Sequence, residues 1–413
     1  MSLFTPLTLP NGSVIANRIA KAAMEENLAS AQHTPSEPLF RLYQAWADGG
    51  AGLIISGNVM VDRTAMTGPG GVVLEDDTEL DSFKRWAAIG QSSGAQFWLQ
   101  INHPGRQMPA SLGQPTFAPS AVALDLGKMS HYFAPPQAMT EAQIQQVISC
   151  FTRTAKLAEQ AGFKGVQVHA AHGYLLSQFL SPLTNQRNDK WGGSLENRAR
   201  LLIEIVQGIR AQVNPRFAVA VKLNSADFQR GGFSSDDARA VVLMLNQLKV
   251  DLVELSGGSY EAPAMQGAAR DGRTLAREAY FLEFASELAK VATMPVMVTG
   301  GIKRLSVAQQ VLENGVDMVG IATALAIAPD LPKQWQQGNA VVPELAVINW
   351  RNKPLASLAN MALVKYQLSK LSRQKRPKPQ VSPIWALIKQ QLADKCRTRR
   401  YRSWLEKHRQ QLL

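Results

Sequence analysis

Short runs of apolar and β-branched residues alternate with longer amphipathic segments from about residue 19 to residue 330. Such alternation is typical of a parallel sheet whose strands are connected by helices. The pattern predicts eight strands, at Ile19–Ala23, Leu53–Ser56, Gln96–Asn102, Gly165–Ala170, Ala218–Leu223, Leu252–Ser256, Pro295–Thr299 and Met318–Ile321. It predicts helices between them, including Ser36–Ala47, Glu141–Ala161, Leu195–Val213, Ser235–Gln247, Tyr280–Val291 and Val307–Asn314.

Two of these helices carry recognisable start signals. Thr140 precedes Glu141, and Ser234 precedes Ser235, Asp236 and Asp237, so side-chain oxygens are available for the free amides of the first turns. Eight strand–helix units favour a closed (β/α)8 barrel over an open doubly wound sheet, in which about six strands are usual. No G-x-G-x-x-G sequence opens a helix after the first strand, so a Rossmann domain has little support.

We therefore expect a barrel domain over residues 1–343 and a helical C-terminal extension over residues 344–413, split near Arg376–Pro379. In such barrels the chemistry lies at the C-terminal ends of the strands and in the loops that follow them. Two long insertions, at about Thr64–Thr78 and Pro104–Pro136, should border that end. The positions that this rule selects are Met24, Asn58, His103, His169–Tyr174, Asn224, Ser256–Tyr260, Gly300, Gly301 and Thr323.

Composition narrows the class of protein. With 413 residues, 46% hydrophobic and 18% charged, the chain can bury a large core. The N-terminus has no signal-peptide pattern and no apolar run reaches about 18 residues, so we expect a soluble, cytoplasmic protein. Cys150 and Cys396 are the only cysteines, too few for an iron–sulfur or Cys-rich zinc site. We therefore expect no metal site, and an organic cofactor for any redox chemistry.

The charge is concentrated in the extension. Residues 351–413 contain 16 Lys and Arg but only two acidic residues, Asp394 and Glu406, so this segment has a net charge of +14. Because the whole chain has a net charge of +12, residues 1–350 together carry about −2.

The extension also contains two apolar groups at helical spacing: Ile384, Trp385, Leu387, Ile388 and Leu392, then Tyr401, Trp404 and Leu405. This stripe either packs on the barrel or a partner subunit, or contacts an anionic membrane. We favour packing, because burial of apolar side chains stabilises a protein more than surface charges do. We do not expect nucleic-acid binding. The sequence is compatible with a homo-oligomer but does not predict one.

One block after the fourth strand is unusually rich in chemistry. It runs His169-Ala-Ala-His172-Gly-Tyr174-Leu-Leu-Ser-Gln-Phe-Leu-Ser-Pro182, followed by Asn185, Arg187 and Trp191-Gly-Gly-Ser-Leu-Glu-Asn-Arg198. This block resembles the signature of the Old Yellow Enzyme family. Further matches across residues 3–340 are Asn17-Arg18-Ile19, Gln100, His103-Pro-Gly-Arg106, Ser256-Gly-Gly258 and Thr299-Gly-Gly301.

The block predicts a catalytic group. His169 and His172 follow a strand end, so both imidazoles can donate to one substrate oxygen, and Tyr174 supplies a phenol proton nearby. The resemblance implies that the histidines bind the electron-withdrawing group and that the tyrosine protonates the α-carbon after flavin N5 delivers hydride to the β-carbon. The alternative is a structural pair or a zinc site, with His103 as a third ligand.

Cofactor residues follow from anion chemistry and from the resemblance. Gly300 and Gly301 precede a helix, and free amides there suit the FMN phosphate. Gln100 resembles the glutamine at the flavin pyrimidine, although it could be a satisfied interior amide. Lys222 stands where relatives have an arginine beside flavin N1 and C2=O; an interior lysine needs an anionic partner, and we expect reduced FMN to be that partner. Ala23, Met24, Asn58 and Gly258 complete the set.

Two positions depart from the family pattern. Glu25 stands where many relatives have Thr or Cys near flavin C4=O and N5, so its carboxylate either lies ionised beside the flavin or points away to pair with a base. Ala322 and Thr323 replace a Gly-Arg pair whose arginine binds the phosphate in relatives. Lys303 or Arg304 could compensate for that loss.

The resemblance implies an FMN enzyme that takes hydride from NADH or NADPH and reduces electron-poor alkenes such as α,β-unsaturated carbonyls. A flavin dehydrogenase or demethylase acting on another small molecule is the alternative among enzymes. Outside enzymes, the alternative is a membrane or nucleic-acid binding module on a vestigial barrel.

Overall fold

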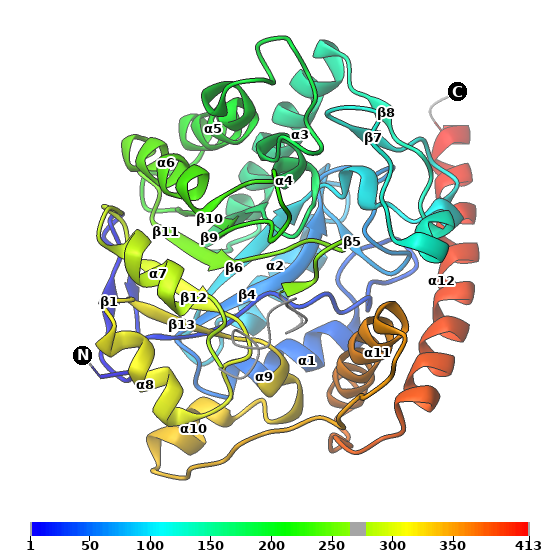
Figure 1. Cartoon of the computed structure of the whole chain (residues 1–413). Coiled ribbons are helices and arrows are strands. Elements are labelled where there is room, and N and C mark those ends of the chain that lie inside the picture. Colours follow the sequence, from blue (N-terminus) through cyan, green and yellow to red (C-terminus); the bar gives the residue numbers. More distant parts are fainter. Residues whose placement is uncertain (1, 265–277, 412–413) are drawn as a thin grey trace.

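Eight parallel strands close into a barrel in the computed structural model, which describes residues 2–264 and 278–411. Ile321 of the last strand pairs with Lys21 of the first, and Lys21 pairs with Ile54, so the sheet has no free edge. This confirms the expected (β/α)8 architecture (Figure 1). The barrel strands are β3 (Ile19–Lys21), β4 (Leu53–Met60), β6 (Gln96–Asn102), β9 (Gly165–Ala170), β10 (Ala218–Asn224), β11 (Leu252–Ser256), β12 (Val296–Thr299) and β13 (Met318–Ile321).

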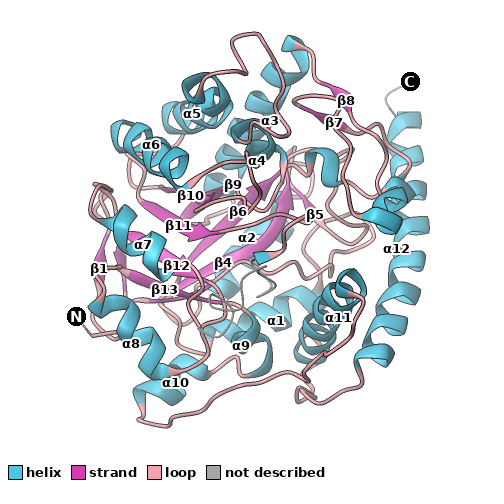
Figure 2. Ribbon diagram, in the orientation of Figure 1, coloured by secondary structure: helices cyan, strands magenta, loops and turns pink. Residues whose placement is uncertain are grey.

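Helices surround the barrel (Figure 2). The six helices named from the sequence are present within two residues or so of their expected bounds, whereas α2 and α9 were not predicted. Both expected start signals operate, since Thr140 and Ser234 each accept a bond from the first-turn amide three residues on. The outer helices are α1 (Glu37–Ala47), α2 (Leu80–Gly90), α3 (Glu141–Gln160), α5 (Leu195–Gln212), α6 (Ser235–Leu245), α7 (Leu282–Ala289), α8 (Leu305–Glu313) and α9 (Thr323–Ile327).

Smaller elements decorate both ends of the barrel. The antiparallel pair β1 and β2 covers the N-terminal end, where Leu7, Leu9 and Ile15 join the interior apolar cluster with Trp98. The remaining elements are β1 (Leu7–Thr8), β2 (Val14–Ile15), β5 (Val72–Val73), β7 (Phe117–Ala118), β8 (Gln137–Ala138), η1 (Gly105–Gln107), η2 (Ala110–Leu112), η3 (Gly127–Tyr132), η4 (Asn246–Leu248), α4 (Leu175–Leu180), α10 (Leu331–Gln336), α11 (Lys353–Leu371) and α12 (Pro383–Gln411).

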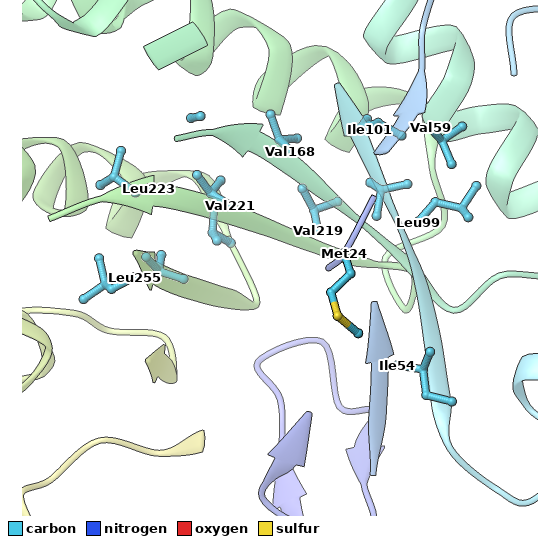
Figure 3. Packing of buried hydrophobic residues seen from close by; sticks show 14 of the residues in the cluster. Met24, Ile54, Val59, Leu99, Ile101, Val168, Val219, Val221, Leu223 and Leu255 are labelled. Atoms are coloured by element: carbon cyan, nitrogen blue, oxygen red, sulfur yellow. The ribbon is translucent and has the colours of Figure 1, made fainter. Parts of the chain in front are cut away.

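The two faces of each strand have different compositions. On β10, Val219, Val221 and Leu223 belong to the large apolar cluster shared with the helices (Figure 3), because alternate side chains point to opposite faces. The inward positions begin apolar with Ala218 and Ala220, in the interior cluster, and continue with Lys222 and Asn224. The barrel interior is therefore apolar toward its N-terminal end and polar toward the C-terminal ends of the strands.

The C-terminal extension packs along one flank of the barrel (Figure 1). Its first helix, α11, contributes Leu368 and Leu371 to the main core, and α12 begins after a non-helical break that contains the expected Arg376–Pro379 split. Tyr401 and Leu405 are buried against Met60, Met66, Met108 and Leu112, which confirms the packing interpretation for the second apolar group.

The first apolar group of the extension does not follow that expectation. Ile384, Trp385, Ile388 and Leu392 are between 45% and 63% exposed, because the face of α12 that carries them points away from the barrel. The prediction that the stripe packs on the barrel is therefore wrong for these four side chains. None of the helices that the structure describes is long and apolar enough to cross a bilayer.

Candidate active site

The predicted catalytic side chains gather at the C-terminal end of the barrel. His169 is an inward residue of β9, and His172 and Tyr174 follow in the turn that leads to α4. The ring of His169 lies 5.1 Å from that of His172 and 4.9 Å from that of Tyr174, measured between centroids. The structure thus brings together the three residues that the sequence motif placed in one group.

Backbone geometry and neighbouring side chains hold the two histidines. His172 adopts a positive φ of 62°, its amide donates to Asn224 Oδ1 at 3.0 Å, and its Nε2 lies 2.7 Å from Ser256 Oγ. Nδ1 of His169 accepts a bond from the Ala171 amide at 3.2 Å. Burial lowers the pKa of both imidazoles well below its usual range, and Lys222 lowers both further. Both rings are therefore neutral at neutral pH.

The Tyr174 phenol has its own polar partners. Its hydroxyl oxygen lies 3.1 Å from that of Tyr260, and Asn58 also bonds to it. Burial, then the neighbouring Tyr260 and Glu25, raises the pKa of Tyr174 well above its usual value, so the phenol keeps its proton. Tyr260 was not singled out from the sequence, although it lies in the strand-end segment Ser256–Tyr260.

A chain of polar side chains crosses the barrel interior below this group. Gln100 Nε2 donates to Gln167 Oε1, Gln167 Nε2 donates to Glu254, and Lys222 Nζ donates to Glu254 Oε1, each at 2.7 Å. The side-chain amide of Gln100 thus has a hydrogen-bond partner inside the barrel, as the alternative interpretation from the sequence expected. The expectation for Lys222 needs correction, because a buried carboxylate already compensates its charge without reduced FMN. Glu254 was missed, although a charged residue at an inward strand position is a readable signal.

The end of β3 places Ala23, Met24 and Glu25 at the same edge. Met24 belongs to the main apolar cluster and Ala23 packs against the interior one. Glu25 Oε2 accepts a bond from Lys365 of α11 at 2.7 Å, and Glu25 Oε1 accepts one from Thr67 at 2.6 Å. The carboxylate therefore pairs with a base, as the second possibility had it, but it does not point away from the site, because its charge acts on Tyr174 and Tyr260.

A second buried cation, Lys21 on β3, was not predicted. Its Nζ donates to the Ile55 carbonyl at 2.7 Å, lies 3.8 Å from Glu26 and sits 4.2 Å from the centre of the Trp46 ring. Burial lowers the pKa of Lys21 to about 8. Lys21 lies on the same face of β3 as Ile19, toward α1 and not toward the barrel interior, so the readable signal was a lysine on a buried apolar face of the first strand.

The glycine pair after β12 leads into a turn whose backbone amides contact a carboxylate of the same chain. Gly300 and Gly301 have φ values of 134° and 73°, and a Cβ on Gly301 would lie 2.5 Å from the Tyr280 ring. The amides of Lys303 and Arg304 donate to the Glu278 carboxylate at 3.2 and 3.1 Å. These two amides are therefore occupied by a carboxylate rather than free, and a phosphate would have to displace Glu278 to use them. The FMN phosphate site at this turn stays a prediction.

The neighbouring positions give less support to a phosphate site. Thr323 is the first residue of α9 and is exposed, and Ala322 precedes it without a side-chain cap. Lys303 pairs with Glu344 at 2.6 Å, and the Arg304 side chain pairs with Glu278 at 2.8 Å. Compensation by Lys303 or Arg304 is therefore not seen in this arrangement, because each side chain is engaged by a carboxylate.

Gly258 and the long insertions border the site. Gly258 has a φ of 86°, and a Cβ there would lie 2.3 Å from the Ala262 carbonyl oxygen. Its own carbonyl accepts a bond from Asn224 Nδ2 at 3.0 Å. Thr67 reaches Glu25, and Gln107 donates to the His172 carbonyl at 3.0 Å, so both insertions border the strand ends as expected.

The zinc alternative lacks a ligand cluster. Over residues 2–264 and 278–411, no three His, Cys, Asp or Glu side chains are grouped so that they could hold a metal ion. His103 Nδ1 instead accepts a bond from the Gly105 amide at 3.1 Å, and burial lowers the pKa of His103 to about 4.

Comparisons with known proteins agree with this geometry. The sequence profile of the NADH:flavin oxidoreductase / NADH oxidase family matches residues 2–341. The NADH-dependent flavin oxidoreductase iliE of Neonectria sp. is 37% identical over 353 positions, which cover 79% of this chain but only 46% of that protein. Its namesake in Hypocrea jecorina is 36% identical over 350 positions, covering 79% of this chain and 87% of that protein. The solved old yellow enzyme homologue of Zymomonas mobilis superimposes with a TM-score of 0.71 at 26% identity, covering 84% and 95% of the two chains.

Proposed function

Because the chain belongs to the NADH:flavin oxidoreductase / NADH oxidase family, to which the Old Yellow Enzymes belong, we propose that it reduces the C=C bond of electron-poor alkenes. The substrates would be α,β-unsaturated carbonyl compounds, with NADH or NADPH as the hydride donor and FMN as the cofactor. The observation that carries the proposal is the grouping of two neutral histidines with a protonated tyrosine at the C-terminal end of the barrel. A cytoplasmic location stays a prediction.

The residues at this end fit FMN in two respects. The amides after Gly300 and Gly301 bind a carboxylate, and a phosphate could take the same donors. Asn102 Oδ1 is buried without a hydrogen-bond partner among the described residues, beside Asn58, and so has acceptor capacity to spare. We assign the cofactor site to these groups together with Ala23, Met24, Gln100, Lys222 and Gly258. Bound FMN would supply reversible hydride transfer between the nicotinamide and the alkene.

The two histidines would bind the carbonyl oxygen of the substrate. Since His169 Nδ1 accepts the Ala171 amide, the neutral ring carries its proton on Nε2, which is free to donate. His172 is oriented by Ser256 and Asn224, so its ring keeps a fixed position beside that of His169. Hydrogen bonds aimed at the carbonyl oxygen polarise the alkene and stabilise the negative charge that develops there during reduction.

Tyr174 would supply the proton. Its phenol is protonated because its pKa is raised, and the hydroxyl is held by Tyr260 and Asn58. A weak acid of this kind transfers a proton only to a strongly basic centre, such as the α-carbon of an enolate-like species. Lys222, in register with His169 on the neighbouring strand, forms an ion pair with Glu254, so the pair adds no net charge beside the reacting atoms.

The visible spectrum of the purified protein tests this assignment. We expect one FMN per chain, bleaching of the flavin on anaerobic addition of NADH or NADPH, and return of its absorbance when a cyclic enone is added. A protein that holds FAD, or that neither retains nor rebinds FMN, contradicts the cofactor assignment. Reduced flavin that no enone reoxidises contradicts the substrate class and favours the dehydrogenase alternative.

A further inference from the structure

The C-terminal extension reaches into the candidate active site through one side chain. Lys365, in the middle of α11, places its Nζ 2.7 Å from Oε2 of Glu25, which lies 340 positions earlier at the end of β3. We propose that Lys365 is a positioning and specificity-determining residue: it holds the Glu25 carboxylate in place and neutralises it at the substrate side of the flavin site. This inference rests on the proposed function and concerns a pair in which Glu25 departs from the family pattern and Lys365 lies beyond the residues that the family profile matches.

Several contacts fix α11 in the position that this role requires. Leu368 and Leu371, three and six residues beyond Lys365, are buried in the main core. The helix α11 packs beside α1 and α9 (Figure 1). Arg41 of α1 donates to the Ser372 carbonyl at 2.8 Å, at the C-terminal end of α11. Because α11 is also buried through Ala362 and Leu363 against Ala386 of α12, Lys365 reaches Glu25 from a well-packed helix.

The Glu25 carboxylate is held by three side-chain donors, two of them from distant segments of the chain. Lys365 and Asn27 donate to Oε2, at 2.7 and 3.3 Å, while Thr67 of the first insertion donates to Oε1 at 2.6 Å. The two charged side chains are 25% and 17% exposed, so water screens the pair only in part. Three donors and partial burial define one orientation of the carboxylate.

The titratable groups that surround Glu25 are few. Lys365 approaches from α11, Tyr174 from the start of α4, and Tyr260 from the loop after β11, while the adjacent Glu26 turns away to Tyr43 and Lys21. Burial alone would raise the pKa of Glu25, but Lys365, Thr67 and Asn27 outweigh it and hold that pKa below its usual value. The charge of Glu25 in turn raises the pKa of both tyrosines. The ion pair therefore lies within electrostatic reach of the proposed proton donor.

The pair has a consequence for substrate choice. With both partners present, this side of the site carries no net charge, so it suits a neutral enone. Removal of Lys365 leaves an anion that repels a substrate carboxylate, whereas removal of the Glu25 charge leaves a cation that attracts one. Lys365 thereby sets which charge class of unsaturated compound the site accepts.

Three variants test the proposal: Glu25→Gln, Lys365→Met and the double variant. We expect Glu25→Gln to raise the FMN midpoint potential, because an unpaired ammonium favours added electrons. Lys365→Met should lower it progressively as the pH rises, because Glu25 without its cation has a raised pKa and ionises only above it. The double variant, which carries neither charge, should return close to wild type at every pH.

Substrate discrimination supplies a second readout. The ratio of kcat/KM for a 2-enoate to kcat/KM for a neutral cyclic enone should rise about tenfold in Glu25→Gln and fall about tenfold in Lys365→Met, as expected for a charge contact in a partly screened site. Lys370→Met is the matched control, because Lys370 lies five residues further along α11 and its Nζ lies 5.6 Å from the centre of the Tyr366 ring. It should change neither the potential nor the ratio.

The outcomes separate this inference from the function on which it rests. A structural role alone would lower the melting temperature of the single variants and leave the potential and the substrate ratio unchanged, and that result would overturn the proposal. A wild-type protein that binds FMN but reduces neither alkene contradicts the proposed function, while opposite shifts of the potential in the two single variants would still support the placement of the pair beside the flavin.

Discussion

The hydroxyl oxygens of Tyr174 and Tyr260 lie 3.1 Å apart, at the junction of the turn before α4 and the loop after β11. The phenol proposed as the proton donor is thus hydrogen-bonded to a second phenol. Either hydroxyl can be the donor of this bond, so Tyr260 can orient the Tyr174 proton without itself contacting the substrate.

Replacement of Tyr174 by Phe should separate the two half-reactions. We expect reduction of the flavin by the nicotinamide to stay within about twofold of wild type, and reoxidation by an enone to slow about 100-fold or more, the usual contribution of a general acid. Stopped-flow absorbance at the flavin band measures both. Tyr132→Phe is the matched control because Tyr132 is 54% exposed, and equal losses in both half-reactions would reject the assigned role.

The buried pair of Lys222 and Glu254 gives a stability prediction. Lys222→Met leaves the Glu254 carboxylate buried without its cation, which should lower the free energy of unfolding by about 3–5 kcal/mol. Adding Glu254→Gln removes that charge while an amide can still bond to Gln167, so the double variant should recover most of the loss. Urea denaturation measures the cycle, with the exposed Lys290→Met as control. A double variant as unstable as the single one would show that the unpaired charge is not the cause.

His33 predicts sensitivity to acid. It is buried against Tyr401 and Trp404 of α12, and burial lowers its pKa to about 4. Because the unfolded chain takes up the proton near pH 6.5, folding stability is lost as the pH falls below that value, by about 2 kcal/mol between pH 7 and pH 5. His33→Gln should remove that part of the pH dependence in thermal unfolding, whereas the exposed His131→Gln should not. Identical pH dependence in wild type and His33→Gln would contradict this origin.

The docked half of α12 should stabilise the whole chain. Leu405→Ala or Tyr401→Ala should lower the free energy of unfolding by about 2–5 kcal/mol, since each removes a fully buried side chain from the cluster with Met60 and Met66. Leu392→Ala, at a residue 63% exposed on the same helix, is the matched control. Truncation after Pro343 should also lower the melting temperature, and an unchanged value would mean that the extension does not support the barrel.

The exposed half of α12 predicts a different behaviour. Ile384, Trp385, Ile388 and Leu392 form an apolar stripe on a helix that also bears exposed Lys395 and Arg399. Such a surface suits the boundary of an anionic membrane, so we expect co-sedimentation with phosphatidylserine vesicles but not with neutral ones. Trp385→Ser with Leu392→Ser should abolish it without changing the melting temperature. If the protein stays in the supernatant with both vesicle types, the stripe does not bind membranes, and a protein partner would be the expected occupant.

Eight strands could be read from the sequence because they are buried on both faces, so most of their positions are apolar or β-branched and only a few inward positions are polar. The capped helices could also be predicted from the sequence, since Thr140 and Ser234 accept hydrogen bonds from amides of their own first turns. The helix α2 was missed although Phe83, Trp86 and Ala87 recur at helical spacing, since Glu79 before it forms no side-chain cap and thus gives no start signal. The grouping of His169, His172 and Tyr174 needed only one strand and the turn after it, so a local motif contained it.

The partners of the buried charges could not be read in the same way. Lys222 and Glu254 are 32 positions apart and meet because β10 and β11 pair in register, while Glu25 and Lys365 meet because α11 packs on α1. The sequence by itself determined the barrel, its strand-end chemistry and the basic extension, because periodicity, caps and turns act over a few residues. Only the tertiary structure decided which charges compensate one another and which apolar face of the extension is covered, because those depend on strand register and helix docking across the whole chain.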